Sequence, residues 1–569
     1  MARFNLRGKR ASAGSPVTTT GEPTRTHEGA TGLLRDARSE LFLLAVANTV
    51  GTDTFYEKAD ARDDRYTALV RQLAVEDPAW TAGLLAWLRT GANMRTASLV
   101  GAAEFVKARL DADRATPAVP APTVPAPAVA APVADSGSAA GSGAASWSNR
   151  SVVDSVLQRA DEPGEMLGYW TARYGRRLPK PVKRGVADAV RRLYNERSLL
   201  AYDTDARGYR FGDVLELVHA APHPDKPWQG ELFKHAIDRR HGRGEDIPPR
   251  LEMLGRRASL MKLPVADRRP VLHDPGKRDA LAKAGMTWEA LAGWLQGPMD
   301  AAAWEAVIPS MGLMALARNL RNFDEAGVGD ETAAHVAARL ADADEVRRSR
   351  MFPFRFWAAY RAAPSLRWGH ALEQALGHSL ANVPALPGRT LILVDRSPSM
   401  FPGYAYSTPN RSDIPLAEQA AVFGAALAVR AQAPTLVEFG QSAREIAVPR
   451  GGSVLRLVEQ FGQIPGTDIP SAVKEYYAGH DRVVVVTDEQ TRPGWLPSNC
   501  YAYNGMPETR IDDLVPRHVP VYMWNMAGYR EAAMPSGGGN RHALGGLTDA
   551  AFGMIPLLDA GRDARWPWE

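Results

Sequence analysis

Oxygen-bearing side chains follow a short apolar segment in the last third of the chain. The segment Thr390–Val394 is followed by the sequence DRSPS (395–399), which places a carboxylate and two hydroxyls at alternate positions. Alternate residues of one loop can direct their oxygens toward a single point. A set of hard oxygen ligands with few negative charges suits Mg²⁺. We therefore expect Asp395, Ser397 and Ser399 to bind one divalent cation.

Two later loops offer further oxygen ligands. Thr467 lies in the short loop 466–468, and Asp488 follows the apolar segment Arg482–Thr487. If both segments are parallel strands, their carboxyl ends meet at one edge of a sheet, where ligands of such sheets bind. The alternative is that these Ser, Thr and Asp residues serve only as turn and cap residues. A phosphatase-type nucleophile at Asp395 is less favoured, because a second carboxylate would be expected at position 397.

A dense run of cations precedes this region in the sequence. Aromatic residues are interleaved with it, which is typical of surfaces that bind phosphates and stack unpaired bases. The alternative is a solvated helix face with the tyrosines directed into the core. The aromatic residues are Tyr169, Trp170, Tyr174 and Tyr194. The cations that we select as candidate RNA ligands are Arg173, Arg176, Arg177, Lys180, Lys183, Arg184 and Arg191.

His219 ends an apolar segment and is followed by His223. No cysteine or third ligand lies nearby in sequence, so a zinc site is disfavoured. A helix C-terminal cap or a phosphate contact fits His219 better.

The elements that must position the oxygen ligands form an α/β pattern over residues 385–569. Short apolar segments alternate with amphipathic ones, which predicts a mostly parallel sheet covered by helices on both faces, a doubly wound Rossmann-like fold. No glycine-rich phosphate loop follows any of the strands, so nucleotide hydrolysis is disfavoured. Besides the two strands already named, the expected strands are Thr435–Phe439, Arg444–Val448 and Val519–Met523, and the expected helices are Leu416–Ala431, Ile469–Tyr477 and Asp549–Leu558.

Residues 31–380 have helical periodicity almost throughout. Successive helices with one apolar stripe each must cover one another, which predicts an α-solenoid of degenerate HEAT-like repeats or, alternatively, an irregular bundle. Residues 1–30 have little to bury and are expected to form a flexible tail. The Pro/Ala/Gly-rich stretch 114–146 is expected to be a disordered insertion.

Bulk composition is that of an ordinary globular protein. The chain has 569 residues, 45% of them hydrophobic and 23% charged, and a net charge of +4. The length exceeds what one core supports, so several domains are expected. A single cysteine, Cys500, excludes an internal disulfide and favours a reducing compartment. We find neither a signal peptide nor a membrane-spanning stretch, and expect a cytoplasmic monomer that does not contact membranes.

The pattern of oxygen ligands resembles the metal-ion-dependent adhesion site of von Willebrand factor A domains. That pattern is Asp-x-Ser-x-Ser, then a threonine and then an aspartate on separate loops. The resemblance assigns the motif 395–399, Thr467 and Asp488 to these three parts. In the family, the sixth ligand is usually water or a partner's carboxylate. Pro398 departs from the small residue usual there, and it stiffens the loop.

A helical array followed by such a domain resembles the TROVE family, which comprises the Ro autoantigen and its bacterial relatives. The similar stretches are GTDTFY (51–56), NMR (93–95), GY (208–209) through DVLELVH (213–219), IPSMGLMALARNL (308–320) and FPFR (352–355). They occur in the family's order over residues 35–569, with the Pro/Ala-rich stretch as an insertion.

The TROVE resemblance implies a helical ring closed by the A domain. Small non-coding Y-type RNAs would bind its outer surface, and single-stranded ends of misfolded RNA would enter the hole. Members are not enzymes, and bacterial ones act with exoribonucleases in RNA degradation and stress recovery. His219 matches a histidine implicated in RNA contact. Two basic positions of the family are Tyr202 and Ala206 here, for which Arg207 and Arg210 are candidate replacements.

Three functions are therefore considered. The first is a non-catalytic scaffold that binds RNA, with no DNA expected as a partner, and that docks an exoribonuclease. The second is a protein-adhesion module whose cation captures a partner's carboxylate, without a role for RNA. The third is a Mg²⁺-dependent hydrolase, which is disfavoured because the sequence contains no obviously positioned base.

Overall fold

A computed structural model gives the arrangement of most of the chain. It describes residues 13–47, 50–115, 147–206, 208–243, 246–381, 383–401, 414–449, 452–493, 508–546 and 549–569. Most of the Pro/Ala-rich insertion expected at 114–146, as well as Arg207 and Cys500, lies outside the described residues.

The first part of the helical array contains ten helices among the described residues. Most of them pack on helices one or two positions away in sequence, α8 contacts α11, and α1 also contacts strand β9 of the α/β domain. These helices are α1 (Ala37–Val46), α2 (Ala59–Glu76), α3 (Pro78–Thr90), α4 (Arg95–Ala115), α5 (Asn149–Val156), α6 (Glu162–Tyr174), α7 (Lys180–Leu193), α8 (Glu196–Tyr202), α9 (Phe211–Val218) and α10 (Pro227–Arg240).

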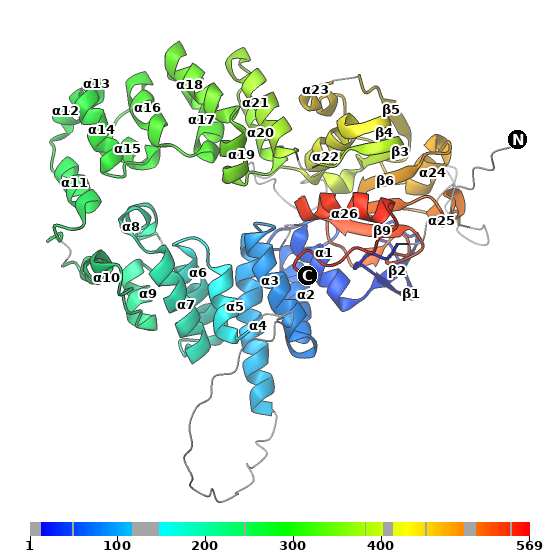
Figure 1. The fold of residues 1–569 in the computed structure, drawn as a ribbon, viewed down its shortest axis with the longest axis horizontal. Coiled ribbons are helices and arrows are strands. Elements are labelled where there is room, and N and C mark those ends of the chain that lie inside the picture. The colour runs from blue at the N-terminus through cyan, green and yellow to red at the C-terminus, as the bar shows by residue number, and fades with distance from the viewer. Residues whose placement is uncertain are drawn as a thin grey trace, which may run out of the picture.

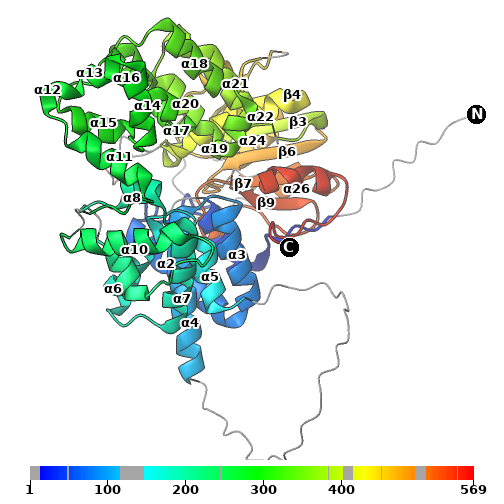
Figure 2. The same cartoon turned by 60° about the vertical axis from the view of Figure 1, so that its left-hand side comes forward.

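The second half of the array continues through α21. In Figure 1 the helices leave the sheet at α1, curve away from it, and come back to it at α21, and Figure 2 shows the two halves on opposite sides, joined around α8 and α11. These helices are α11 (Glu252–Met261), α12 (Val265–Arg268), α13 (Pro270–His273), α14 (Pro275–Lys283), α15 (Trp288–Leu295), α16 (Ala301–Val307), α17 (Leu313–Glu325), α18 (Asp330–Leu340), α19 (Ala343–Ser349), α20 (Pro353–Ala362) and α21 (Leu366–Ser379).

The expected α/β domain follows, with a six-stranded sheet in the order β5-β4-β3-β6-β7-β9. All neighbouring pairs are parallel except β4 with β5. The sequence predicted five of these strands, and the edge strand β9 was missed. The strands are β3 (Leu386–Asp395), β4 (Ala431–Phe439), β5 (Ala443–Ile446), β6 (Arg482–Thr487), β7 (Val521–Asn525) and β9 (Arg541–Gly545).

Helices cover both faces of this sheet. Alternate strand residues enter two different cores, as the pleat of a strand requires. Leu391 and Val483 pack with α24 (Ile469–Tyr476) and α25 (Ile511–Leu514). Their neighbours Ile392 and Val484 pack with α22 (Leu416–Arg430), α23 (Val454–Val458) and α26 (Asp549–Asp559). The second core continues into the helical array.

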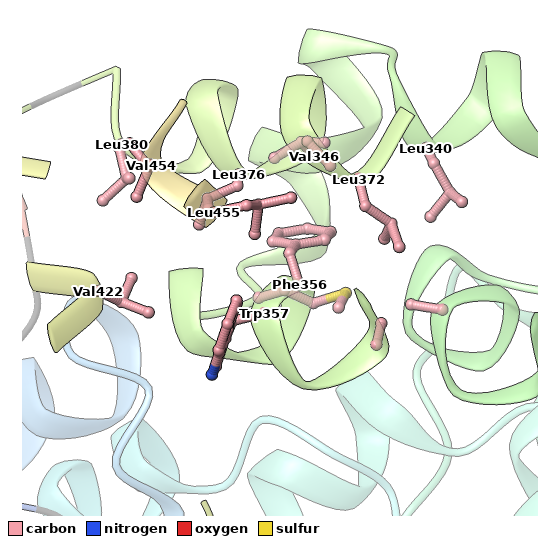
Figure 3. Packing of buried hydrophobic residues seen from close by; sticks show 14 of the residues in the cluster. Leu340, Val346, Phe356, Trp357, Leu372, Leu376, Leu380, Val422, Val454 and Leu455 are labelled. Carbon is pink, nitrogen blue, oxygen red and sulfur yellow. The ribbon is translucent and has the colours of Figure 1, made fainter. Parts of the chain in front are cut away.

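The junction between that core and the array is built on two aromatic residues of α20. Figure 3 shows Phe356 and Trp357 among apolar side chains of neighbouring elements. Both are buried, and the indole nitrogen of Trp357 donates to the Glu418 carboxylate on α22. The labelled neighbours are Leu340, Val346, Leu372, Leu376, Leu380, Val422, Val454 and Leu455.

The beginning of the chain corrects one prediction. Residues 13–30 were expected to belong to a flexible tail, yet β1 (Thr19–Arg25) pairs antiparallel with β2 (Thr31–Arg35), which pairs with β8 (Glu531–Ala532). This three-stranded sheet is held by backbone hydrogen bonds, which a polar sequence can make without a large apolar surface. Residues 1–12 lie outside the described part. The α/β unit therefore includes an N-terminal segment.

The end of the chain returns to the first helices. Trp566 packs edge-on against Phe42 and Trp80, with ring centroids 5.1 and 5.2 Å apart. Trp568 packs against Trp80 and Trp87 at 5.4 and 5.6 Å. Such aromatic contacts add about 0.5–1.5 kcal/mol each beyond the area that they bury. The last residues thus belong to the core of α1–α3.

No helix in the part of the chain that the structure describes is long and apolar enough to cross a membrane.

His542 on β9 should make stability depend on pH. Its imidazole is fully buried against Tyr522, and neither ring nitrogen has a hydrogen-bond partner among the described residues. Burial lowers the pKa of His542 to about 4, and Arg541 contributes to the decrease. The unfolded chain binds this proton near pH 6.5 and the folded chain only near pH 4. Stability should therefore fall as the pH drops through that window, by about 2 kcal/mol at pH 5.

Denaturant unfolding at pH 7 and pH 5 measures this effect. The loss of stability between the two pH values should be about 2 kcal/mol smaller in His542→Leu than in the natural protein. Equal losses in the two proteins would contradict the assignment.

Candidate metal centre and RNA-binding surface

Two carboxylates lie at the point where the strand order of the sheet reverses. From β3 the next strand, β4, lies on one side, and β6 lies on the other. Asp395 ends β3, and Asp488 directly follows β6, whose Val486 is in register with Val394. Both side chains are fully buried. The crevice beyond the carboxyl ends of strands at such a switch point is where open α/β sheets bind ligands.

The hydroxyls of the loop 395–399 lie beside the first carboxylate. The Ser397 amide donates to Asp395 Oδ1 at 2.8 Å, and the two serine hydroxyls, of Ser397 and Ser399, are 3.1 Å apart. Pro398 opens a 3-10 turn over Pro398–Met400. Proline suits this first position, because its backbone nitrogen needs no hydrogen-bond partner there. The departure at Pro398 is therefore compatible with the loop geometry.

Thr467 reaches the same edge of the sheet through backbone contacts. Its carbonyl accepts from the Arg492 amide at 3.0 Å, in the segment after Asp488, and the amide of Asp468 donates to Gly440 after β4 at 2.9 Å. Thr467 is 2% exposed. Asp468 instead caps α24 by accepting from the Ser471 amide at 3.0 Å. All five predicted ligands thus lie buried at one end of the sheet.

The electrostatics of this edge favour a cation. Burial raises the pKa of Asp488 to about 7, and the charge of Asp395 adds to the increase. Burial also raises the pKa of Asp395, and hydrogen bonds from Ser397 and Thr487 partly oppose this increase. Asp488 Oδ2 has no hydrogen-bond partner among the described residues. A buried unpaired carboxylate oxygen is costly, and a divalent cation would compensate it.

The donor set fits a hard cation rather than zinc. Within the described residues, no three His, Cys, Asp or Glu side chains are grouped as a metal site. A site at this edge would therefore combine two carboxylates with three hydroxyls. Such a set of oxygen ligands suits Mg²⁺.

Arg396 holds the loop in place, a role that the sequence did not reveal. Its guanidinium group is 4.9 Å from the Phe401 ring and 5.6 Å from the Phe461 ring. It donates to the carbonyls of Gly462 and Ala417, each at 2.5 Å. The side chain is buried, so this cation acts as a structural anchor.

Five of the predicted RNA ligands form a group of unpaired cations in the turn after α6 and the first turns of α7. None of them has an ion-pair or hydrogen-bond partner for its side chain among the described residues, and only Lys183 is half-buried. Gly175, with φ of 79°, ends α6 and turns the chain toward α7. We call this group the basic corner; it comprises Arg176, Arg177, Lys180, Lys183 and Arg184.

Other predicted RNA ligands are engaged in ion pairs. Arg173 lies 3.1 Å from the fully buried Glu104 carboxylate. Arg210 pairs with the buried Asp203 at 2.9 Å and is itself only 13% exposed. Arg191 lies 3.8 Å from Asp188. Because these cations neutralise carboxylates of the fold, they are poorer phosphate ligands than the basic corner.

His219 occupies the C-cap of α9 with a left-handed backbone, φ 54° and ψ 48°. The cap that the sequence favoured is therefore present. The side chain is exposed and has no partner within the described part of the chain.

The interleaved aromatic residues correct the expectation of base stacking. Trp170 and Tyr194 are 2% exposed and belong to the core. The hydroxyls of Tyr169 and Tyr174 donate to Glu104 at 2.7 and 2.5 Å. The alternative, in which the tyrosines are directed into the protein, is the better description.

Comparison with known proteins agrees with the arrangement of the fold. Residues 251–368 match the model of the TROVE domain. A search of curated proteins finds no match. The crystal structure of the Deinococcus radiodurans Ro (Rsr) protein aligns with a TM-score of 0.56 and 17% identity, over 92% of this chain and 99% of that one. The helical array with its α/β domain is thus a fold shared with a Ro protein, and residues 251–368 are similar to the TROVE domain.

Proposed function

We propose that this protein is a non-catalytic RNA-binding scaffold of the Ro type. The observation that carries the proposal is the basic corner, where five neighbouring cations have no partner among the described residues. Cations that the fold does not neutralise are free to bind phosphates and to release counterions. The TROVE match over residues 251–368 supports RNA as the phosphate-bearing partner.

We further propose that the array and the α/β domain form a closed ring, with the latter acting as a von Willebrand A domain. The support is that α1 contacts β9 while α20 contacts α22, so both ends of the array adjoin that domain. A small non-coding, Y-like RNA would bind the outer surface, and single-stranded ends of misfolded RNA would enter the ring. The role would be RNA quality control with an exoribonuclease, during stress, in the cytoplasm.

The α/β domain would hold one Mg²⁺ ion. The support is the buried pair Asp395 and Asp488, with an unpaired carboxylate oxygen and three hydroxyl residues close by. When bound, the ion supplies positive charge that orders the three loops and can capture a partner's carboxylate. The second candidate function, protein adhesion, is thus compatible with the same site. We assign docking of a protein partner to it.

Reversing the charge of the basic corner should abolish RNA binding. Five substitutions to Glu at Arg176, Arg177, Lys180, Lys183 and Arg184 place negative charges against phosphates. Replacing them by Ala instead should reduce the slope of log Kd against log salt by about 4. Filter binding of a structured RNA over a range of salt concentrations measures both effects.

A matched control separates the effect of charge at the basic corner from the effect of the protein's net charge. The triple change Arg177→Glu, Lys180→Glu and Arg184→Glu should weaken binding far more than the same change at the exposed Arg517, Arg562 and Arg565. Equal weakening by both triple variants would show that only net charge matters. Unchanged affinity in the fivefold Glu variant would refute the RNA surface.

Arg210→Ala should act on stability rather than on RNA. It leaves the buried Asp203 with the Phe211 amide at 2.9 Å and with one more distant cation, Arg239 at 3.5 Å, and should cost about 3 kcal/mol of the free energy of unfolding. Affinity for RNA per folded molecule should stay within about twofold, because Arg210 is already paired. Thermal melts and binding at 10 °C measure the two effects. A large loss of affinity without a loss of stability would make Arg210 a direct RNA ligand.

Magnesium should stabilise the natural protein and not Asp488→Asn. A ligand that binds only the folded state adds about 2.7 kcal/mol at one hundred times its Kd. The Asn variant lacks the charge needed to bind the ion, so its melting temperature should not respond to Mg²⁺. Glu445→Gln, an exposed change on β5, is the control and should respond as the natural protein does. An identical Mg²⁺ response in Asp488→Asn would contradict the site.

A further inference from the structure

A buried carboxylate on α4 binds the end of α6, directly before the basic corner. Glu104 is fully buried, and its Oε1 accepts from the hydroxyls of Tyr169 and Tyr174 at 2.7 and 2.5 Å. Its Oε2 accepts from Arg71 of α2 at 3.3 Å, and the Arg173 guanidinium lies 3.1 Å from Oε1. A buried carboxylate must be paired and hydrogen-bonded to be stable. These contacts meet that condition and join α2, α4 and α6.

The last two residues of α6 are both bonded to this carboxylate. They are Arg173 and Tyr174, and Gly175 then turns the chain with φ of 79°. Arg176 and Arg177, the first two cations of the basic corner, follow directly. The position of these two cations therefore depends on how firmly the end of α6 is held.

Packing supports the same turn on both sides. The Tyr174 ring centroid is 5.0 Å from that of Trp170, and Lys107 Nζ is 5.3 Å from it. After the two exposed arginines, Leu178 is half-buried and packs against the core of the first helices. The arginines thus lie between two anchors, the Tyr174 side chain and Leu178.

A different contact positions the other three cations of the corner, which lie on α7. This helix packs closely on α5, because a Cβ atom on Gly185 would lie 2.6 Å from the Arg150 carbonyl oxygen. The Arg150 guanidinium also donates to both carboxylate oxygens of Asp188, at 2.5 and 2.8 Å. The basic corner therefore consists of two parts with separate anchors. The bonds to Glu104 determine how the first part is aligned with the second.

The charge of Glu104 and its position have opposite effects on RNA binding. Its negative charge repels phosphates and neutralises Arg173, so removal of the charge alone should strengthen the attraction to RNA. If Glu104 instead aligns the turn, its removal should weaken binding. The sign of the change therefore distinguishes the two roles.

We propose that Glu104 is a positioning residue for RNA binding, which acts through Tyr174 to hold Arg176 and Arg177 in line with the cations of α7. This inference rests on the RNA surface proposed above. Glu104 is buried and does not itself contact the RNA. Cations that are already held in place lose less conformational freedom when they bind phosphates, and affinity rises accordingly.

Binding of a structured RNA to the full-length protein tests the proposal. Tyr174→Phe removes one hydroxyl without a change of charge and should weaken binding about fivefold per folded molecule. Glu104→Gln should also weaken binding, although it removes a negative charge. Tyr209→Phe is the matched control, because the Tyr209 hydroxyl donates to Thr171 of the same helix at 2.9 Å and not to Glu104. It should bind RNA as the natural protein does.

A double-mutant cycle shows whether the effect passes through the two arginines. In a chain that carries Arg176→Ala and Arg177→Ala, Tyr174→Phe should cause no further loss of affinity, because the residues that it positions are gone. The same loss in both backgrounds overturns the proposal.

The single variants decide the rest. Unchanged binding by Tyr174→Phe, or tighter binding by Glu104→Gln, overturns the positioning role. Equal weakening by Tyr209→Phe also overturns it, because any loosening of α6 would then be sufficient. Failure of the RNA surface itself gives a different result, in which the fivefold Glu variant of the basic corner binds as the natural protein does. If that variant loses RNA while Tyr174→Phe keeps it, only the role of Glu104 is wrong.

Discussion

The structure depends on one α/β domain covering both ends of a helical array. The first and last helices of such an array each lack a neighbour on one side, so each leaves an apolar face that must be covered. At the first end, Arg62 and Arg65 of α2 donate to the carbonyls of Ala527 and Gly528, after β7. A Cβ atom on Gly528 would lie 2.6 Å from the Leu44 Cα, so only glycine permits this approach. At the second end, α20 packs on α22 through Trp357.

The same junction determines where the candidate cation site lies. Arg35 pairs with Glu489 at 2.5 Å, and both are buried. Glu489 also accepts from Asn525 and from the Ala533 amide. Glu489 directly follows Asp488, so the contact that fastens the N-terminal segment also fixes the loop that carries this candidate metal ligand. Packing of the N-terminal segment and ordering of the Asp488 loop are therefore coupled through the buried carboxylate of Glu489.

Much of the α/β domain was predictable from sequence because its strands are continuous apolar segments. Arg482–Thr487 has the predicted bounds, and α22 and α24 each end one residue before the prediction. The candidate oxygen ligands of the loop 395–399 could also be selected from sequence, since the spacing in DRSPS is local. The hairpin β1–β2 was not, because it is polar and is held by partners at the other end of the chain. Thr31, for example, donates to Glu508.

The free cations could not be told from the paired ones by sequence. Arg173 and Arg176 look alike in a basic run, but only Arg173 has a buried carboxylate, Glu104, within reach. That partner lies about 70 residues earlier, on α4, so composition does not reveal it. The aromatic residues were misjudged for the same reason. The hydroxyls of Tyr169 and Tyr174 donate to Glu104, and this network is internal to the fold.

The two tryptophans near the C-terminus have a consequence for the order of folding. Trp566 and Trp568 complete the core of α1–α3, yet they are synthesised several hundred residues after those helices. Phe42 and Trp80 therefore stay uncovered until the segment with the two tryptophans has been made. Contacts of such long sequence separation form late and leave apolar surface exposed meanwhile. A chain stalled or cut shortly before Trp566 would keep that surface open and would be a natural target for chaperones and proteases.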